Sequence, residues 1–195
     1  MSGAPRPRTL SGSRLQLVAF EPEFFGAVCQ WRSDPEVTRY WITQDVPDLA
    51  DIRRWYEKNL ATGALVWAIL SQREPIGYVT LFDIDEVNRK AELALMIGER
   101  SAWGQGFARE TLRIVLLHAF AAESDGGLEL NKVYLAVFTE NVAARRAYRA
   151  SGFREDGLLR EDMFRAGTWH DQVLMSALAR EFNELVATFA TGGNR

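Results

Sequence analysis

Hydrophobic and polar positions along the chain show their clearest periodicity between residues 91 and 120. Residues 91–98 carry four large apolar side chains and no proline, which predicts a strand buried on at least one face. From Phe107 onward, apolar residues recur at intervals of three and four, as on a helix with one buried face: Leu112, Val115, Leu116 and Ala119. Trp103-Gly104-Gln105-Gly106 separates the two stretches. The pattern is therefore strand, glycine turn and long helix.

Similar patterns predict the remaining elements. We expect further strands at residues 15–19, 64–71, 76–82, 133–138, 153–164 and 172–178. We expect further helices from Pro22 to the break at Asp34-Pro35, and over residues 49–60, 142–150 and 179–189. The sequence shows no repeat and no internal linker. It predicts one α+β domain over residues 14–189, with an unstructured tail at 1–13 and a loose tail at 190–195.

Composition narrows the class of protein. The chain has 195 residues, enough for a substantial core, and a net charge of −3, which argues against broad nucleic-acid binding. Cys29 is the only cysteine, so no internal disulfide can form, and without a secretory apolar segment we expect a cytoplasmic protein. No apolar run approaches the roughly 20 residues that span a bilayer. Two histidines and one cysteine give no metal-ligand spacing, so we expect no metal.

The glycine turn is a candidate anion site. Backbone N–H groups at a helix N-terminus point outward and favour negative charge, above all phosphate, and glycines let a ligand approach the bare backbone. The turn is not a P-loop, because no GKS or GKT follows, and Arg109 stands where GxGxxG has its third glycine. The alternative is that Gly104 and Gly106 only shape a strand-to-helix turn.

A second motif follows the strand at 133–138. Asn141 is a good N-cap for the next helix, which ends at Gly152, and Tyr148 lies two turns after Asn141 on nearly the same side. This helix carries three arginines and no acidic residue: Arg145, Arg146 and Arg149. The alternative is a solvated basic face with a tyrosine in the core.

In these motifs, in this order, the chain resembles the GNAT superfamily of N-acetyltransferases, in the branch of ribosomal-protein N-terminal and spermidine acetyltransferases. The matching segments are NRKAEL (88–93), MIG (96–98), WGQGFARE (103–110), NVAARRAYRASGF (141–153) and GTWHDQVLMSAL (167–178), with WRSDPEVTRYW (31–41) near the front. The resemblance implies an α/β/α sandwich whose mixed, mostly antiparallel sheet is splayed where acetyl-CoA binds. It also implies acetyl-CoA as co-substrate and no metal.

The resemblance assigns roles to particular residues. The pantetheine arm of acetyl-CoA would bond to the backbone of Leu95, Met96 and Ile97, and Asn141 would hold it from the helix that it caps. The diphosphate would lie on the N–H groups of Trp103, Gly104, Gln105, Gly106, Phe107 and Ala108. Ser101 departs from the family, which often has Arg or Gln there, and Arg100, Arg109 or Arg145 could supply positive charge instead.

Two side chains are candidates for catalysis. Tyr148 would face the thioester sulfur, since a phenol with pKa ~10 can hydrogen-bond or protonate a departing thiolate. Glu92 is the candidate general base, because the family often places a carboxylate there and a neutral amine must attack. The alternative for Glu92 is a surface glutamate at a strand edge.

The acceptor side is expected on the first two helices, their connector and the turn before residue 92, with Trp41, Tyr56 and Phe82 as aromatic walls. Acidic and basic residues are mixed there, which favours a peptide or protein N-terminus over spermidine. An aminoglycoside or amino sugar remains open as acceptor. A non-catalytic acyl-CoA-binding module is the alternative of another class, although Tyr148 argues against it. A homodimer also stays open.

Overall fold

A computed structural model describes residues 7–41 and 45–191. The outermost parts of the two expected tails, residues 1–6 and 192–195, lie outside the described residues. The chain divides into two compact units, Met1–Ile84 with Leu93–Ile114 and Asp85–Glu92 with Val115–Arg195. The described strands are hydrogen-bonded in the order β1-β2-β3-β4-β5-β6-β8-β7, and strand β5 (Lys90–Ile97) has residues in both units.

The expected α+β fold with a mixed, mostly antiparallel sheet is confirmed. In the described residues the parallel pairing is between β5 and β6 (Lys132–Phe138), and it covers Lys90 to Glu92 against Lys132 to Tyr134. The pairs β1–β2, β2–β3, β3–β4, β6–β8 and β7–β8 are antiparallel. Because the parallel pairing covers only three residues of each strand, most backbone groups of β5 and β6 are not hydrogen-bonded to the other strand.

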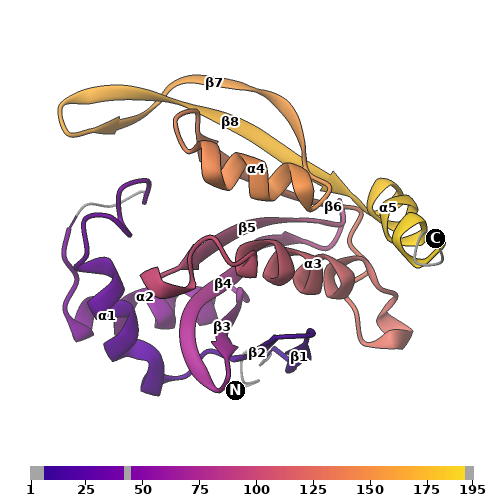
Figure 1. Cartoon of the computed structure of the whole chain (residues 1–195), viewed down its shortest axis with the longest axis horizontal. Coiled ribbons are helices and arrows are strands. Elements are labelled where there is room, and N and C mark those ends of the chain that lie inside the picture. Colours follow the sequence, from indigo (N-terminus) through magenta and orange to yellow (C-terminus); the bar gives the residue numbers. More distant parts are fainter. Residues whose placement is uncertain (1–6, 42–44, 192–195) are drawn as a thin grey trace. The chain divides into compact units, whose positions relative to one another are not determined.

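The first unit contains the N-terminal strands, two helices and the glycine turn (Figure 1). Its elements are β1 (Leu10–Ser11), β2 (Leu15–Ala19), η1 (Pro22–Phe24), α1 (Phe25–Arg32), α2 (Leu49–Ala61), β3 (Leu65–Ser71), most of β4 (Glu74–Asp85), the end of β5, η2 (Arg100–Ala102) and the first half of α3 (Phe107–Phe120). Helix α2 begins with a capping box in which Asp48 and Asp51 each accept the other's backbone N–H.

An aromatic core fills one face of this unit. Buried residues of α1 and α2 pack against alternate residues of β3 and β4, and the cluster comprises Phe20, Phe25, Val28, Trp31, Ile52, Val66, Ala68, Tyr78 and Met96. Tyr78 lies at its centre, with ring centroids of Trp55 at 5.2 Å and Trp41 at 5.9 Å. Burial of such large rings is a major source of hydrophobic stabilisation, so this cluster holds α1 and α2 on the sheet.

The second unit contains a long hairpin and two helices. Its elements are the start of β5, the second half of α3, η3 (Glu123–Asp125), β6, α4 (Val142–Ala150), β7 (Arg154–Arg165), β8 (Thr168–Leu178) and α5 (Ala179–Thr191). Helix α4 lies along the β7–β8 hairpin (Figure 1), where Arg145 and Arg149 form ion pairs with Glu155. Phe182 of α5 packs on Phe120 of α3.

Two expectations about the N-terminal half need correction. Residues 7–13 were expected to lack structure, but Leu10–Ser11 forms β1 by pairing with Leu17 and Gln16, because the edge of β2 offers unpaired backbone groups. The strand expected to begin at residue 76 begins instead at Glu74, because the turn before it consists of Gln72 and Arg73, which both have positive φ.

Candidate active site

The glycine turn of the first unit has the conformation that only glycine adopts without strain. Gly104 and Gly106 have φ of 73° and 80°. A Cβ added at Gly104 would meet no atom within 4 Å, so the space beside this backbone is open. Helix α3 starts directly afterwards, and the first N–H groups of a helix have no acceptor within the helix. The turn therefore presents accessible N–H donors to an anion.

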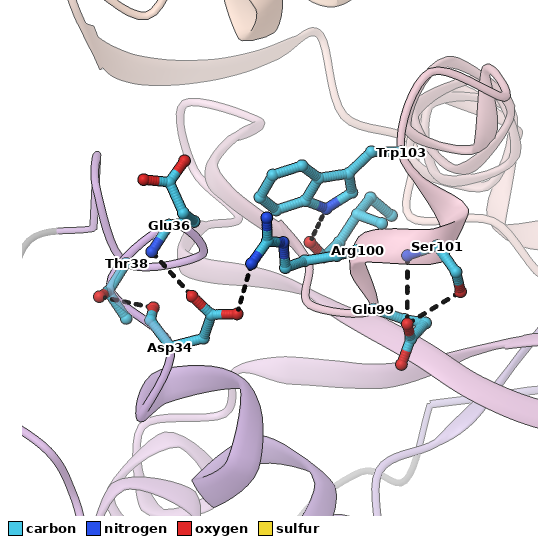
Figure 2. Close-up of polar contacts among 8 residues, drawn as sticks. Asp34, Glu36, Thr38, Glu99, Arg100, Ser101 and Trp103 are labelled. Atoms are coloured by element: carbon cyan, nitrogen blue, oxygen red, sulfur yellow. Dashed lines mark hydrogen bonds and ion pairs between the residues drawn. The ribbon is translucent and has the colours of Figure 1, made fainter.

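Trp103 links this turn to the end of β5. Its indole Nε1–H donates to the Ile97 carbonyl at 2.8 Å, and the Arg100 guanidinium lies 5.9 Å from the centre of its ring (Figure 2). Arg100 in turn reaches Asp34, after α1, at 3.4 Å. The side chain of Trp103 is still 41% exposed. The Ile97 carbonyl, expected to bind the pantetheine arm, thus already has a donor.

Ser101 has a role that the sequence did not reveal. Its backbone N–H and its hydroxyl both donate to Glu99 Oε1, at 3.1 and 2.8 Å (Figure 2). The Ser101 N–H is therefore not available to a phosphate. The donors that remain for an anion come from the glycines onward.

Arg14 fastens the other side of the turn, and sequence reasoning missed it. Its Nη1 donates to the Gln105 carbonyl at 3.0 Å, and its guanidinium carbon lies 4.6 Å from the centre of the Phe107 ring. Its Nε donates to Glu110 Oε2 at 2.8 Å, while its backbone N–H donates to Glu110 Oε1 at 2.8 Å. In the sequence, the one signal for this contact was Glu110, an acidic residue in the first turn of α3.

In the second unit, Asn141 is the predicted N-cap. Its Oδ1 accepts the Ala144 N–H at 3.1 Å and fixes the first turn of α4. A side-chain amide has one acceptor and two donor hydrogens, so capping leaves the Nδ2 donors to a ligand. The helix ends before Gly152, which has φ of 97°, as expected of a C-terminal glycine.

Tyr148 lies two turns further along α4. Its ring packs against Phe153, with centroids 5.6 Å apart. The side chain is part-buried, and burial raises the pKa of its hydroxyl to about 12. The neutral phenol is therefore the form present throughout the physiological pH range.

The backbone around Glu92 is also defined. Glu92 is part-buried and lies opposite Tyr134, in the last residue pair of the parallel register between β5 and β6. The residues after it on β5 include part-buried Leu95 and Ile97 and buried Met96.

The three expected acceptor residues differ in their surroundings. The Tyr56 hydroxyl donates to the Phe20 carbonyl at 2.8 Å, and its ring packs within the aromatic core. Trp41 packs edge-on against Tyr78 in the same core. Phe82 is part-buried near the end of β4. Tyr56 and Trp41 thus both pack against the aromatic core, to which Phe82 does not belong.

Two of the three arginines that could supply positive charge for a diphosphate are engaged within their own units. Arg145 donates to the Thr139 carbonyl at 2.8 Å and to Glu155 at 2.9 Å, and Arg100 is bound to Asp34. Arg109 is exposed in the first turn of α3 and forms no ion pair within the described residues.

Over residues 7–41 and 45–191, no cluster of three or more His, Cys, Asp or Glu side chains could hold a metal ion. None of the helices described is long and apolar enough to cross a membrane.

Comparison with known proteins agrees with these features. A sequence model of the family described as "Acetyltransferase (GNAT) domain" matches residues 14–154. The "Uncharacterized N-acetyltransferase p20" of Bacillus licheniformis is 31% identical over 180 residues, which cover 89% of this chain and 98% of p20. The "Putative ribosomal N-acetyltransferase YdaF" of Bacillus subtilis is 33% identical over 106 residues, 54% of this chain and 55% of YdaF.

A solved structure supports the same relationship. The crystal structure of spermidine N-acetyltransferase from Vibrio cholerae, in complex with CoA and spermine, superposes with a TM-score of 0.79. It is 27% identical in sequence, and the match covers 88% of this chain and 99% of that one. The glycine turn, the capped α4 helix and the mixed sheet thus occur in a chain that belongs to the GNAT family of acetyltransferases.

Proposed function

We propose that this chain transfers the acetyl group of acetyl-CoA directly to a primary amine. The observation that carries this proposal is the turn at Gly104 and Gly106. There two left-handed glycines and open space precede the first N–H groups of α3. Such a turn suits the diphosphate of CoA, because the dipole of helix α3 and the N–H donors at its start both favour an anion.

The residues present fit the rest of CoA as well. The Nδ2 donors of Asn141 are suited to a pantetheine carbonyl, and Arg109 is placed in the first turn of α3 to add positive charge for a phosphate. Because the Ile97 carbonyl accepts the Trp103 indole, we expect the pantetheine amides to use backbone groups at Leu95 and Met96 first.

The chemistry is one displacement. The nitrogen lone pair of a neutral amine attacks the thioester carbon, the carbon–sulfur bond breaks, and CoA departs as a thiolate while the amine loses a proton. We assign the acceptance of that proton, directly or through water, to Glu92, since a base raises the share of neutral amine. No covalent bond to the protein is required.

Tyr148 acts on the leaving sulfur. A thiol has a pKa of ~8.5, whereas burial raises the pKa of the Tyr148 hydroxyl to about 12. A proton would therefore stay on the phenol at equilibrium, and we expect Tyr148 to stabilise the thiolate chiefly as a hydrogen-bond donor. Its packing on Phe153 holds the ring in place for this task.

For the acceptor, we propose an α-amine at a peptide or protein N-terminus. Three carboxylates of α2 and the connector before it are engaged by the chain itself. Asp34 binds Arg100, and Asp48 and Asp51 form the capping box. A polyamine, with several positive charges, calls for carboxylates that are free to pair with it. An α-amine with pKa ~8 is also neutral in about a tenth of molecules at pH 7, so it asks less of a base.

Spermidine is the second candidate, favoured by the Vibrio cholerae spermidine N-acetyltransferase, whose structure matches most of this chain. The two acceptors are separated by kcat/KM for spermidine and for a panel of short peptides with free N-termini, measured as CoA release. We expect at least one peptide to exceed spermidine. A spermidine value more than about tenfold above every peptide would make the polyamine the acceptor.

A further inference from the structure

Thr80, on β4, has a buried hydroxyl that lacks a partner. Its side chain is 3% exposed, and its Oγ1 forms no hydrogen bond within the described part of the chain. Buried polar groups are nearly always paired, because an unpaired one keeps the full cost of its desolvation. A valine of almost the same shape would avoid that cost. The hydroxyl at this position therefore calls for an explanation outside the packing of the core.

The register of the sheet shows which way Thr80 faces. Thr80 lies opposite Val66, and Tyr78 lies opposite Ala68. Val66, Ala68 and Tyr78 all belong to the aromatic core beneath α1 and α2. Since side chains two residues apart on a strand share a face, Thr80 and Phe82 continue the row that begins at Tyr78.

Burial decreases along this row. Tyr78 is fully buried, Thr80 nearly so, and Phe82 part-buried. On β5, Met96 belongs to the same core, and Ala94, which shares its face of the strand, is part-buried. Thr80 thus lies at the margin of the core, between the fully buried Tyr78 and the part-buried Phe82.

We propose that Thr80 Oγ1 binds the acceptor amine, an inference that rests on the proposed function. The hydroxyl accepts a hydrogen bond from one N–H of the neutral amine, which leaves the nitrogen lone pair for the thioester carbon. Phe82 supplies the adjacent apolar wall. A neutral hydroxyl, unlike a carboxylate, does not favour the protonated and unreactive form of the amine. This choice suits a substrate with a single amino group better than a polycation.

The test uses Thr80→Val, with Thr80→Ser to restore the hydroxyl. Thr111→Val is the matched control, because Thr111 on α3 is 0% exposed and its hydroxyl also lacks a partner among the described residues, yet it is absent from the core beneath α1 and α2. KM for the amine, kcat, the Kd of acetyl-CoA and Tm are measured for each variant. Calorimetry of the amine with the CoA-bound protein gives a readout that does not depend on turnover.

For Thr80→Val we expect an amine KM and Kd about tenfold higher, an unchanged acetyl-CoA Kd, and a Tm equal to or above that of the wild type. Thr80→Ser and Thr111→Val should keep the wild-type amine KM. An unchanged amine KM in Thr80→Val, or an equal increase in Thr111→Val, would overturn the role of Thr80 while the acetyltransferase assignment stands. A wild type that neither binds nor acetylates any amine would overturn the proposed function, and the role of Thr80 with it.

Discussion

Arg14 and Glu110 are 96 residues apart in sequence and joined by two hydrogen bonds, one from the guanidinium and one from the backbone of Arg14, each 2.8 Å long. Arg14 also donates to the Gln105 carbonyl, so this pair ties the start of β2 to the glycine turn and to the first turn of α3. Burial alone would raise the pKa of the Glu110 carboxyl, but the hydrogen bonds from Arg14 and Ser13 outweigh it and hold that pKa below its usual value.

The first prediction follows from this pair. Glu110→Gln should lower Tm at pH 7 by about 2–4 °C, the effect of roughly 1 kcal/mol in a chain of this size. Because the pKa of Glu110 is depressed in the folded state, its stabilisation is present above about pH 4.5 and is lost as pH falls through the folded pKa. The difference between wild type and variant, measured by calorimetry, should therefore shrink below about pH 4.

The control for this prediction is Arg54→Met. It removes an ion pair with Asp51 whose two side chains are both largely exposed, and such pairs contribute little to stability. A Glu110→Gln variant that is no less stable than Arg54→Met at pH 7 would show that the Arg14 contact is incidental.

The second prediction separates backbone strain from ligand contact in the glycine turn. Gly104 has φ of 73° and Gly63 has φ of 75°, and an added Cβ would meet no atom within 4 Å at either place. Gly104→Ala and Gly63→Ala should therefore cost a similar stability, about 1 kcal/mol. Only Gly104→Ala should weaken acetyl-CoA binding, by about tenfold or more in calorimetry, because its methyl group stands where a phosphate oxygen approaches. Equal affinities in the two variants would mean that the diphosphate binds elsewhere.

The third prediction concerns turnover. Tyr148→Phe should lower kcat by about 10²–10⁴-fold while the Kd of acetyl-CoA changes little, since the lost hydroxyl acts on the leaving sulfur. The ring, and its packing on Phe153, is retained in the variant. Single-turnover kinetics measures the rate of the chemical step itself. If that rate in Tyr148→Phe equals the wild-type rate, Tyr148 is only a packing residue.

The fourth prediction concerns the stability of the folded protein at alkaline pH, which depends on the same hydroxyl. Burial raises the pKa of Tyr148 to about 12, above the value of ~10 that an unfolded chain would show. The group therefore favours the folded state below about pH 10, and this contribution is lost as pH rises from there toward the folded pKa. Thermal unfolding of wild type and Tyr148→Phe between pH 9 and pH 12 should show a smaller alkaline loss in the variant. Parallel curves would indicate a phenol that is open to water.

Local patterns were sufficient to predict much of the fold. Alternation marked β2, runs of apolar, β-branched and aromatic residues marked β3, β5 and β6, and the helical period marked α3. The N-cap at Asn141 and the glycine at 152 bounded α4 to the residue. These signals are local, because each depends on a strand face, a helix face or a chain turn.

Features set by distant contacts could not be read in this way. The extent of strand β7 was predicted to within one residue at each end, but the shifts in its register with β8, between Glu155 and Gly157 and between Leu159 and Met163, were not. The positive φ values of Gln72 and Arg73 occur at residues that carry no such signal in sequence. Nothing near Arg14 in the sequence points to Glu110, and the unpaired hydroxyl of Thr80 follows from a sheet register that only the folded chain defines.

The most direct test of the account is acetyl transfer itself. The purified protein is mixed with acetyl-CoA, first alone and then with peptides or spermidine, and both the protein and the amine are examined by mass spectrometry while released CoA thiol is measured. We predict that the amine gains one acetyl group for each CoA released, and that the protein remains unmodified when the amine is omitted. Binding of acetyl-CoA without acetylation of any amine, or an acetylated protein that forms before amine is added, would contradict direct transfer of the acetyl group to the amine.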